Sequence, residues 1–305
     1  MKKSVFMIAL AFGVSSAFAQ DLTSKKGEPI LPEAEDWAIS MDADPIFRFV
    51  GNAFNGNTGN AAPGAGFLNG NNTIIGKKFI DEKSAYRVLV RLGYTSISTK
   101  AMIGDATVTT APVYPEVPKM VEDKWSRNST NIGIGVGKEF RRGKTRLQGY
   151  YGADVMIWIS SLTDKYKYGN DLSVGTPAVT VANSTNFGTG NITSDSYGNA
   201  ARITKNKSGM TFGIGVRGFV GAEYFIFPKI SVGAEYGWGI GFQSTGKGKR
   251  TVESIGGTTP QVGEIETVTS GSSRFGFDTD LNQGTIFGFR GSNTGSASLR
   301  ATFHF

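Results

Sequence analysis

Apolar side chains alternate with polar residues or glycine in eight segments of the chain, and a period of two is typical of β-strands. The segments are 37–44, 73–80, 84–98, 131–140, 144–159, 210–226, 229–242 and 296–305. The alternation is clearest in 84–98, where the even-numbered residues from Tyr86 to Tyr94 are apolar, whereas Arg87 and Arg91 lie on the opposite face. The pattern predicts an all-β protein.

The two faces of these strands differ in a way that favours a membrane-spanning barrel. In most segments one face is apolar and free of charge along most of its length, whereas the other carries charges and glycines. A soluble barrel encloses its apolar face, but a membrane barrel turns it toward lipid. Several segments also reach the ~9–11 residues that a strand needs to cross a bilayer. Glycine on the charged face suits the crowded interior of a narrow barrel.

The lengths of the connections predict the topology. Short turns at 81–83, 141–143 and 227–228 alternate with long segments at 45–72, 99–130, 160–208 and 243–295. Three short turns and four long loops are expected for a closed eight-stranded, antiparallel, up-and-down transmembrane β-barrel with long extracellular loops and both termini in the periplasm. The alternative is a ten-stranded barrel that uses the runs 274–277 and 285–289 as crossings. Both runs are short, so we expect them to form a hairpin above the membrane.

The two ends of the chain indicate export to the outer membrane of a Gram-negative bacterium. Lys2 and Lys3 precede a short apolar run, and Ala17-Phe18-Ala19 has the small residues of a cleavage site. We therefore expect residues 1–19 to be a cleaved signal peptide, 20–36 a periplasmic N-terminal segment, and 37–305 the barrel. The last strand alternates and ends on Phe305, as closing strands of such barrels do.

Charge and composition exclude some classes of function. The formal net charge is +7, and removal of Lys2 and Lys3 would leave +5. The excess is spread out, without the basic stripe of a nucleic-acid-binding protein, so we expect no nucleic-acid partner. The short basic clusters at 138–144 and 247–250 are interpreted as turns, with lipopolysaccharide binding as the alternative. There is no cysteine to carry a lipid.

Several stretches resemble a known family. Residues 36–45 (DWAISMDADP), 49–54 (FVGNAF), 74–79 (IIGKKF) and the closing Phe303-His304-Phe305 are similar to the outer-membrane β-barrel (porin-like) proteins common in Bacteroidetes, and more broadly to small OmpA/OmpX-type barrels. The resemblance implies a fold rather than an activity. We expect contacts with outer-membrane lipid and lipopolysaccharide, with the barrel-assembly machinery through the C-terminal strand, and with a possible membrane-protein complex.

Alternation places ten charged residues in the interior of the barrel. They are Arg87, Arg91, Arg146, Arg217, Arg300, Asp42, Glu139, Asp154, Glu223 and Glu235. Eight strands enclose a space only wide enough for side chains to fill, and unpaired charges there would be costly. We therefore predict an ion-pair network that plugs the interior. Its functional alternative is a gated path for small ions.

Aromatic residues on the apolar face are candidates for the girdles that mark the two membrane interfaces. They are Trp37, Tyr86, Tyr94, Tyr151, Tyr224, Tyr236, Trp238, Phe303 and Phe305.

Catalytic chemistry is not indicated. His304 is the only histidine. Outer-membrane hydrolases use a histidine beside Ser or Asp, usually near the outer rim, whereas His304 is expected at the periplasmic end, facing the interior. No residues have metal-ligand spacing. We predict no enzyme, cofactor or metal site, but a structural or interaction protein with a plugged interior; a narrow porin-like channel is the alternative.

Overall fold

The computed structural model describes residues 22–24, 26–43, 49–50, 52–56, 73–174, 184–278 and 297–305, so the predicted signal peptide lies outside the described residues. Thirteen strands form one hydrogen-bonded sheet in this part of the chain. They are β1 (Trp37–Asp42), β2 (Ile74–Asp81), β3 (Ser84–Gly104), β4 (Met120–Arg142), β5 (Leu147–Lys167), β6 (Ile192–Ser194), β7 (Ala200–Lys207), β8 (Thr211–Phe227), β9 (Ile230–Thr245), β10 (Gly248–Gly256), β11 (Gln261–Thr269), β12 (Ser272–Asp278) and β13 (Ala297–His304). None of the described helical residues belongs to a helix with the length and apolarity needed to cross a bilayer.

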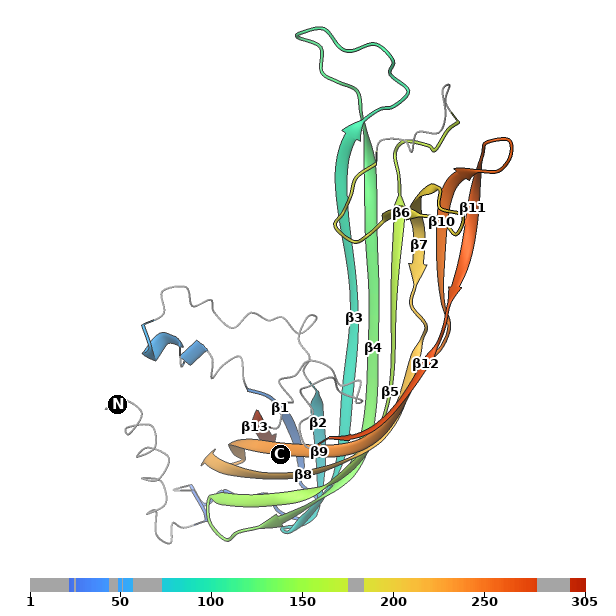
Figure 1. Ribbon diagram of the computed structural model, residues 1–305. Helices are drawn as coiled ribbons and strands as arrows, with labels where there is room; N and C mark the ends of the chain where they lie inside the picture. The colour runs from blue at the N-terminus through green and yellow to red at the C-terminus, as the bar shows by residue number, and fades with distance from the viewer. Residues whose placement is uncertain are drawn as a thin grey trace.

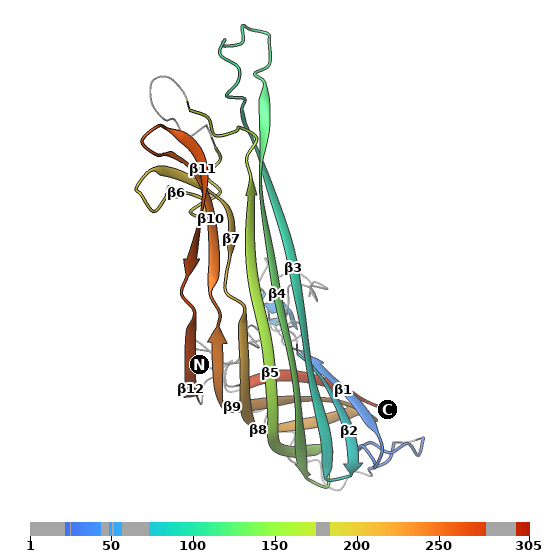
Figure 2. The ribbon, with the colours of Figure 1, turned by 90° about the vertical axis from the view of Figure 1, so that its right-hand side faces the viewer.

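Eight of the strands close into a ring. Antiparallel pairing runs in the order β1, β2, β3, β4, β5, β8, β9, β13 and returns to β1. These are the eight segments predicted from alternation, in the predicted up-and-down order. Figure 2 shows the lower part of the sheet curving back on itself to make this ring.

The register of the ring is staggered. Starting from Ile230 on β9, the directly paired residues are Phe303, Ile39, Gly76, Val88, Val136, Val155, Val216 and then Ile240, which is again on β9. Following the paired residues once around the ring therefore ends ten residues farther along β9 than it began. Ten residues at about 3.3 Å each, across eight strands about 4.8 Å apart, incline the strands by roughly 40° to the axis of the ring.

The short turns and both sequence ends of the ring lie together, at what we call the turn end. The backbones of Trp37 and Phe305 exchange hydrogen bonds of 2.8 Å there. Residues 22–24 and 26–36 lie across this end. Ile30 is fully buried and accepts a 3.3 Å hydrogen bond from the backbone of Lys229, and Lys229 also pairs with Asp36.

Opposite the turn end, one side of the sheet continues far beyond the ring as a tall wall (Figure 1). β3 and β4 have 21 and 23 residues, and β7, β10 and β11 extend the sheet beside β5. Only short gaps separate β7 from β8, β9 from β10, and β11 from β12. Much of the three predicted loops 99–130, 160–208 and 243–295 is therefore strand, and the loop prediction was wrong there. Both faces of these strands carry polar residues, which concealed their period of two.

The run 274–277, one half of the predicted hairpin, is also a strand. It belongs to β12, which pairs with the upper half of β9, with Phe275 opposite Phe242. β13 pairs with the lower half of the same edge of β9. The run therefore pairs with β9 in the sheet and shares that edge of β9 with β13. The run 285–289 lies outside the described residues.

Candidate functional site

The side chains of the ring are apolar outside and polar inside. Leu92 on β3 is 72% exposed, whereas its neighbour Arg91 is 5% exposed. Glycines on the inner face make room for large side chains. A Cβ on Gly213 would overlap the indole of Trp158, and one on Gly221 would overlap the ring of Tyr150. Large side chains thus fill the interior, and glycines on the neighbouring strand leave the room that they need.

Arg87, on β3, is the centre of an ion-pair network in this interior. Its guanidinium lies 3.3 Å from Glu139, 3.5 Å from Asp154 and 3.0 Å from Glu235, and it stacks 3.8 Å from the ring centre of Phe219. The arginine and its three carboxylates come from β3, β4, β5 and β9. A single side chain therefore ties together four strands of the ring.

Further pairs extend the network on both sides of Arg87. Glu139 also pairs with Lys77 and Arg141, each at 2.8 Å, and Arg141 pairs with Glu223. Arg217 lies 3.2 Å from Asp154 and 2.6 Å from Glu235. The members are Lys77, Arg87, Arg141, Arg217, Glu139, Asp154, Glu223 and Glu235. Four cations balance four carboxylates, and every member is buried.

The structure brings six of the ten predicted interior residues into this network: Arg87, Arg217, Glu139, Asp154, Glu223 and Glu235. Arg91 and Arg300 are buried on the same inner face, closer to the wall, where Arg300 donates to the carbonyl of Thr73 at 3.2 Å. Asp42, at the end of β1, is half-buried.

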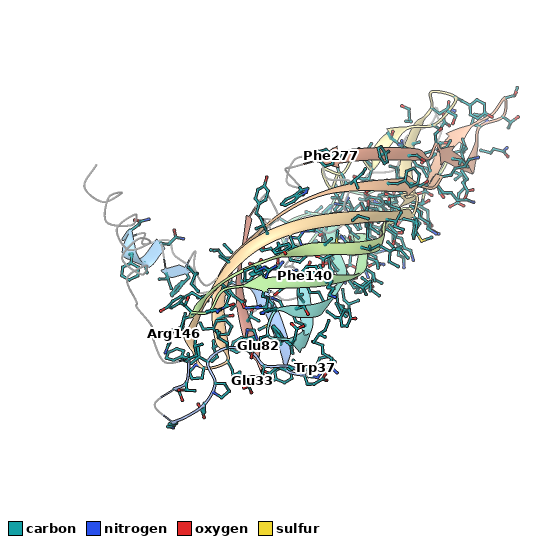
Figure 3. All side chains as sticks on the ribbon, turned by 90° about the horizontal axis from the view of Figure 1, so that it is seen from below. Glu33, Trp37, Glu82, Phe140, Arg146 and Phe277 are labelled. Carbon is teal, nitrogen blue, oxygen red and sulfur yellow. The ribbon has the colours of Figure 1, made fainter. Side chains whose placement is uncertain are left out.

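Arg146 does not reach the carboxylates. It lies at the rim of the turn end (Figure 3), where its guanidinium donates to the carbonyls of Phe225 and Ile226 at 3.4 and 3.2 Å. Sequence reasoning also missed two members, Lys77 and Arg141. The facing of 73–80 was ambiguous, and Arg141 was assigned to a turn. Continuing the alternation two residues beyond Glu139 would have placed Arg141 inside.

Apolar side chains close the interior on both sides of the network. Toward the turn end, the rings of Phe79 and Phe225 flank His304 with centres 5.6 and 5.0 Å away. Toward the wall lies a buried cluster of Ile75, Leu89, Met156 and Trp158. The ionic layer is therefore sealed between two water-excluding layers, where its charges depend on one another for compensation.

His304 contacts a serine, but in the wrong order for a hydrolase. Its Nε2 is 3.3 Å from Oγ of Ser231, and the same hydroxyl donates to Glu223 at 3.2 Å. In a catalytic triad the histidine stands between the serine and the carboxylate. Here the serine stands in the middle, and all three groups are buried. The arrangement is that of a packed interior.

The nine predicted interfacial aromatics all point outward. Trp37, Tyr86 and Phe303 lie toward the turn end, with exposures of 51%, 56% and 43%, as do Tyr151, Tyr224 and Phe305. Tyr94 lies farther along β3, at the level where the wall begins. Tyr236 and Trp238 lie halfway along β9, with ring centres 5.9 Å apart, so they belong to neither girdle.

The wall has a small core of its own, made by Tyr166, Tyr168, Ala201, Ile203 and Val252. Tyr168 donates to the carbonyl of Ile203 at 2.8 Å, and burial raises the pKa of its phenol to about 12. This core lies on the face of the wall that continues the inner face of the ring, which leaves the opposite face of the wall to solvent or to partners.

Comparison with known proteins adds little. No protein-family model matches the chain, and neither does any curated protein. A similar solved structure is the crystal structure of a major outer membrane protein from Thermus thermophilus. It is 12% identical, the match covers 89% of this chain and 100% of that one, and the TM-score is 0.25. Similarity at this level carries no argument, and the resemblance to the Bacteroidetes family stays a prediction.

Proposed function

We propose that this chain is an outer-membrane β-barrel protein of a Gram-negative bacterium, that its ring spans the bilayer, and that its interior is closed to solutes. The observation that carries the proposal is the reversal of polarity: apolar side chains cover the outside of the ring, while buried ion pairs between four cations and four carboxylates lie inside. A water-soluble ring would place these groups the other way round.

The dimensions of the apolar surface support this proposal. On β5, the outward residues from Leu147 to Ile159 span twelve residue steps. Strands inclined by roughly 40°, with a rise of about 3.3 Å per residue, make this band about 30 Å tall, which equals the hydrocarbon thickness of a bilayer. Short turns of such barrels face the periplasm, so the wall rises on the extracellular side. The last strand, β13, is the segment that we expect the barrel-assembly machinery to bind.

A closed interior favours a structural or interaction role over transport. The apolar layers at Phe79 and Trp158 seal the network, and Arg87 occupies the centre between three carboxylates. The wall, standing above the membrane, supplies the surface for partners. The second candidate function is a narrow ion channel. Its opening would require Glu139, Asp154 and Glu235, the three carboxylates that pair with Arg87, to exchange this arginine for other cations.

Two tryptophans allow a direct test in vesicles that contain lipids brominated along the acyl chains. Trp238 points outward and is 36% exposed, whereas Trp158 points inward and is 1% exposed. Variants that keep one of these tryptophans, with the others replaced by Phe, report each face separately. We expect strong quenching of Trp238 and weak quenching of Trp158. Equal quenching of the two would overturn the assignment of inside and outside.

Planar-bilayer recordings on the same preparations test the closed interior. We expect no stepwise conductance from the wild-type protein. Large and unblocked current steps would favour the channel and contradict the plug.

A further inference from the structure

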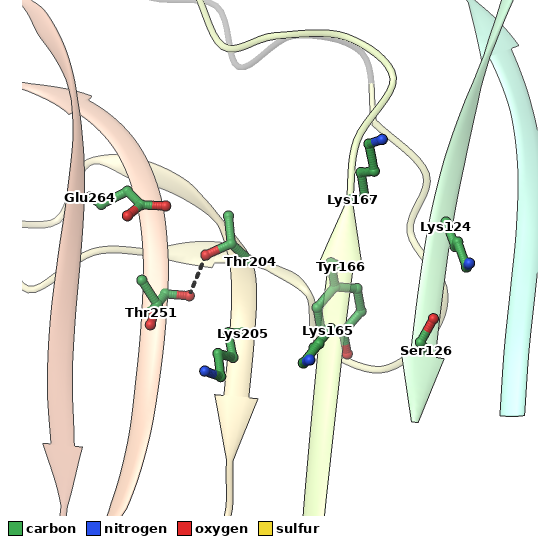
Figure 4. A pocket seen from close by; sticks show the side chains of 9 residues that line it. All are labelled: Lys124, Ser126, Lys165, Tyr166, Lys167, Thr204, Lys205, Thr251 and Glu264. Carbon is green, nitrogen blue, oxygen red and sulfur yellow. Dashed lines mark hydrogen bonds between the residues drawn. The ribbon is translucent and has the colours of Figure 1, made fainter. Parts of the chain in front are cut away.

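The outward face of the wall carries an unusual group of cations. Lys124, Lys165, Lys167 and Lys205, which we call the lysine face, surround a shallow pocket of about 490 Å³ on β4, β5 and β7 (Figure 4). The other residues lining the pocket are Ser126, Tyr166, Thr204, Thr251 and Glu264. Four cations thus surround a space that contains one carboxylate.

The register makes this arrangement costly unless an anion is present. Lys124 lies directly opposite Lys167, and Lys165 directly opposite Lys205, in each case with both side chains on the outward face. Like charges directly opposite in an antiparallel pair destabilise a sheet. An anion bound between the pairs would remove this repulsion.

Two neighbouring lysines on the same face have carboxylate partners, unlike the members of the lysine face. Lys100 pairs with Glu122 at 3.0 Å, and Lys249 pairs with Glu266 at 2.7 Å. Within the described ranges no ion pair involves the four residues of the lysine face. The positive charge there is available to a ligand from outside the chain.

The height of the lysine face restricts which ligand it meets. Along β5, outward residues change from Ile157 and Ile159 to Ser161 and Thr163, and then to Lys165 and Lys167. The six residues from Ile159 to Lys165 rise about 15 Å along strands inclined by roughly 40°. The headgroup layer of an ordinary bilayer is only about 5–8 Å thick on each side. The lysines therefore lie above the phosphates of glycerophospholipids, at the level of a larger headgroup.

We infer that the lysine face binds the phosphate groups on the saccharide headgroup of an outer-leaflet glycolipid of the lipopolysaccharide type. The hydroxyls of Ser161 and Thr163 then lie level with its innermost sugars, and the lysines level with phosphorylated sugars farther out. The inference rests on the proposed function, because it needs the ring to span the outer membrane with the wall outside.

The test is binding of fluorescently labelled lipopolysaccharide to the full chain in detergent micelles. Each lysine beside an anionic membrane surface contributes about fivefold in affinity. We expect the double variant Lys165→Gln/Lys205→Gln to bind about 10- to 30-fold more weakly than wild type. The matched control is Lys83→Gln/Lys144→Gln, which removes the same charge from exposed positions at the turn end, far from the lysine face, and should change affinity less than about threefold.

Three competitors identify the ligand chemistry: unlabelled lipopolysaccharide, the same material after phosphatase treatment, and micelles containing phosphatidylglycerol. We expect competition only by the first. Competition by phosphatidylglycerol at a similar concentration, or an equal loss of affinity in both double variants, would overturn the inference. Inorganic phosphate added alone should compete only at high concentration; competition as strong as that of lipopolysaccharide would show a free-phosphate site and also overturn it.

Two further measurements separate this inference from the proposed function. Quenching of Trp238 by brominated lipid, measured on each variant, reports insertion of the ring. Normal quenching with unchanged lipopolysaccharide binding refutes the lysine face alone, whereas absent quenching in the wild type refutes the proposed function itself. Lys165→Gln/Lys205→Gln removes a repulsive pair, so its unfolding temperature without lipid should not fall.

Discussion

Replacing Arg87 with methionine tests whether the charge network stabilises the ring. Arg87 is 1% exposed and within ion-pair distance of Glu139, Asp154 and Glu235. The substitution leaves three buried cations facing four carboxylates. Removing one partner of a buried ion pair costs about 3–5 kcal/mol. Each carboxylate keeps another cation in the variant: Asp154 and Glu235 keep Arg217, and Glu139 keeps Lys77 and Arg141. We therefore expect the free energy of unfolding to fall by about 3 kcal/mol, the lower end of that range.

The double variant Arg87→Met/Glu235→Gln restores neutrality. It leaves three cations and three carboxylates, and the methionine retains an apolar contact with Phe219. We expect its free energy of unfolding to return to within about 1 kcal/mol of wild type. With the single variant Glu235→Gln measured as well, the double-mutant cycle should give a favourable coupling between positions 87 and 235 of at least about 2 kcal/mol. Arg142→Gln, at an exposed rim position, is the control for loss of one positive charge and should change little.

The assay is urea titration of the protein refolded into phospholipid vesicles, followed by tryptophan fluorescence and by the gel mobility of unheated samples. Both probes must give the same midpoint for a two-state analysis. The reasoning is refuted if Arg87→Met unfolds within about 0.5 kcal/mol of wild type, or if the double variant is less stable than the single one.

Three further outcomes follow from contacts elsewhere in the molecule. Gly213→Ala would press a methyl group into Trp158 and should lower the free energy of unfolding by about 1–3 kcal/mol, whereas Gly149→Ala, whose nearest atom lies 3.7 Å away, should be tolerated in the same urea titration. Ile30→Asp should release the segment 22–36 from the turn end, so limited proteolysis should cut this segment faster while the ring stays resistant. Burial raises the pKa of Asp195, but hydrogen bonds from Asn199, Ser254 and Tyr197 offset this and hold the pKa at about 2. Because this pKa is below the ordinary value of 3.8, the stabilisation is present above pH ~4 and is lost as the pH falls toward 2. The protection factors of the Tyr197 and Asn199 amides, relative to the unfolded chain at the same pH, should fall in that range, and Asp195→Asn should remove this pH dependence.

The ring was predictable because each of its strands separates two different environments. Val88 and Arg87 are neighbours in sequence, yet one points to the apolar outside and the other to the ionic inside, so the period of two is visible in composition. The turns were equally visible, because short polar connections such as 81–83 interrupt the pattern.

The wall was missed because water contacts much of both its faces. At the end of β5 and just beyond it, the inward residues Tyr166 and Tyr168 still alternate with Lys165 and Lys167, so a weak signal was present in the sequence Lys-Tyr-Lys-Tyr. An amphipathic pattern of tyrosine and lysine resembles an exposed loop when composition alone is considered. The pairing that makes it a strand joins β5 to β4 and β7 across long stretches of chain.

The two missed members of the network show what alternation, taken strand by strand, does not contain. The six predicted members are two arginines and four carboxylates. Arg300 is also buried on the inner face, as alternation predicts, yet its guanidinium donates to the carbonyl of Thr73. Lys77 on β2 and Arg141 on β4 pair with Glu139 instead. A buried carboxylate needs a cation within reach, and which cation is within reach depends on how the strands are staggered. The stagger follows from the register of all eight strands together, so the partners cannot be read from any one strand alone.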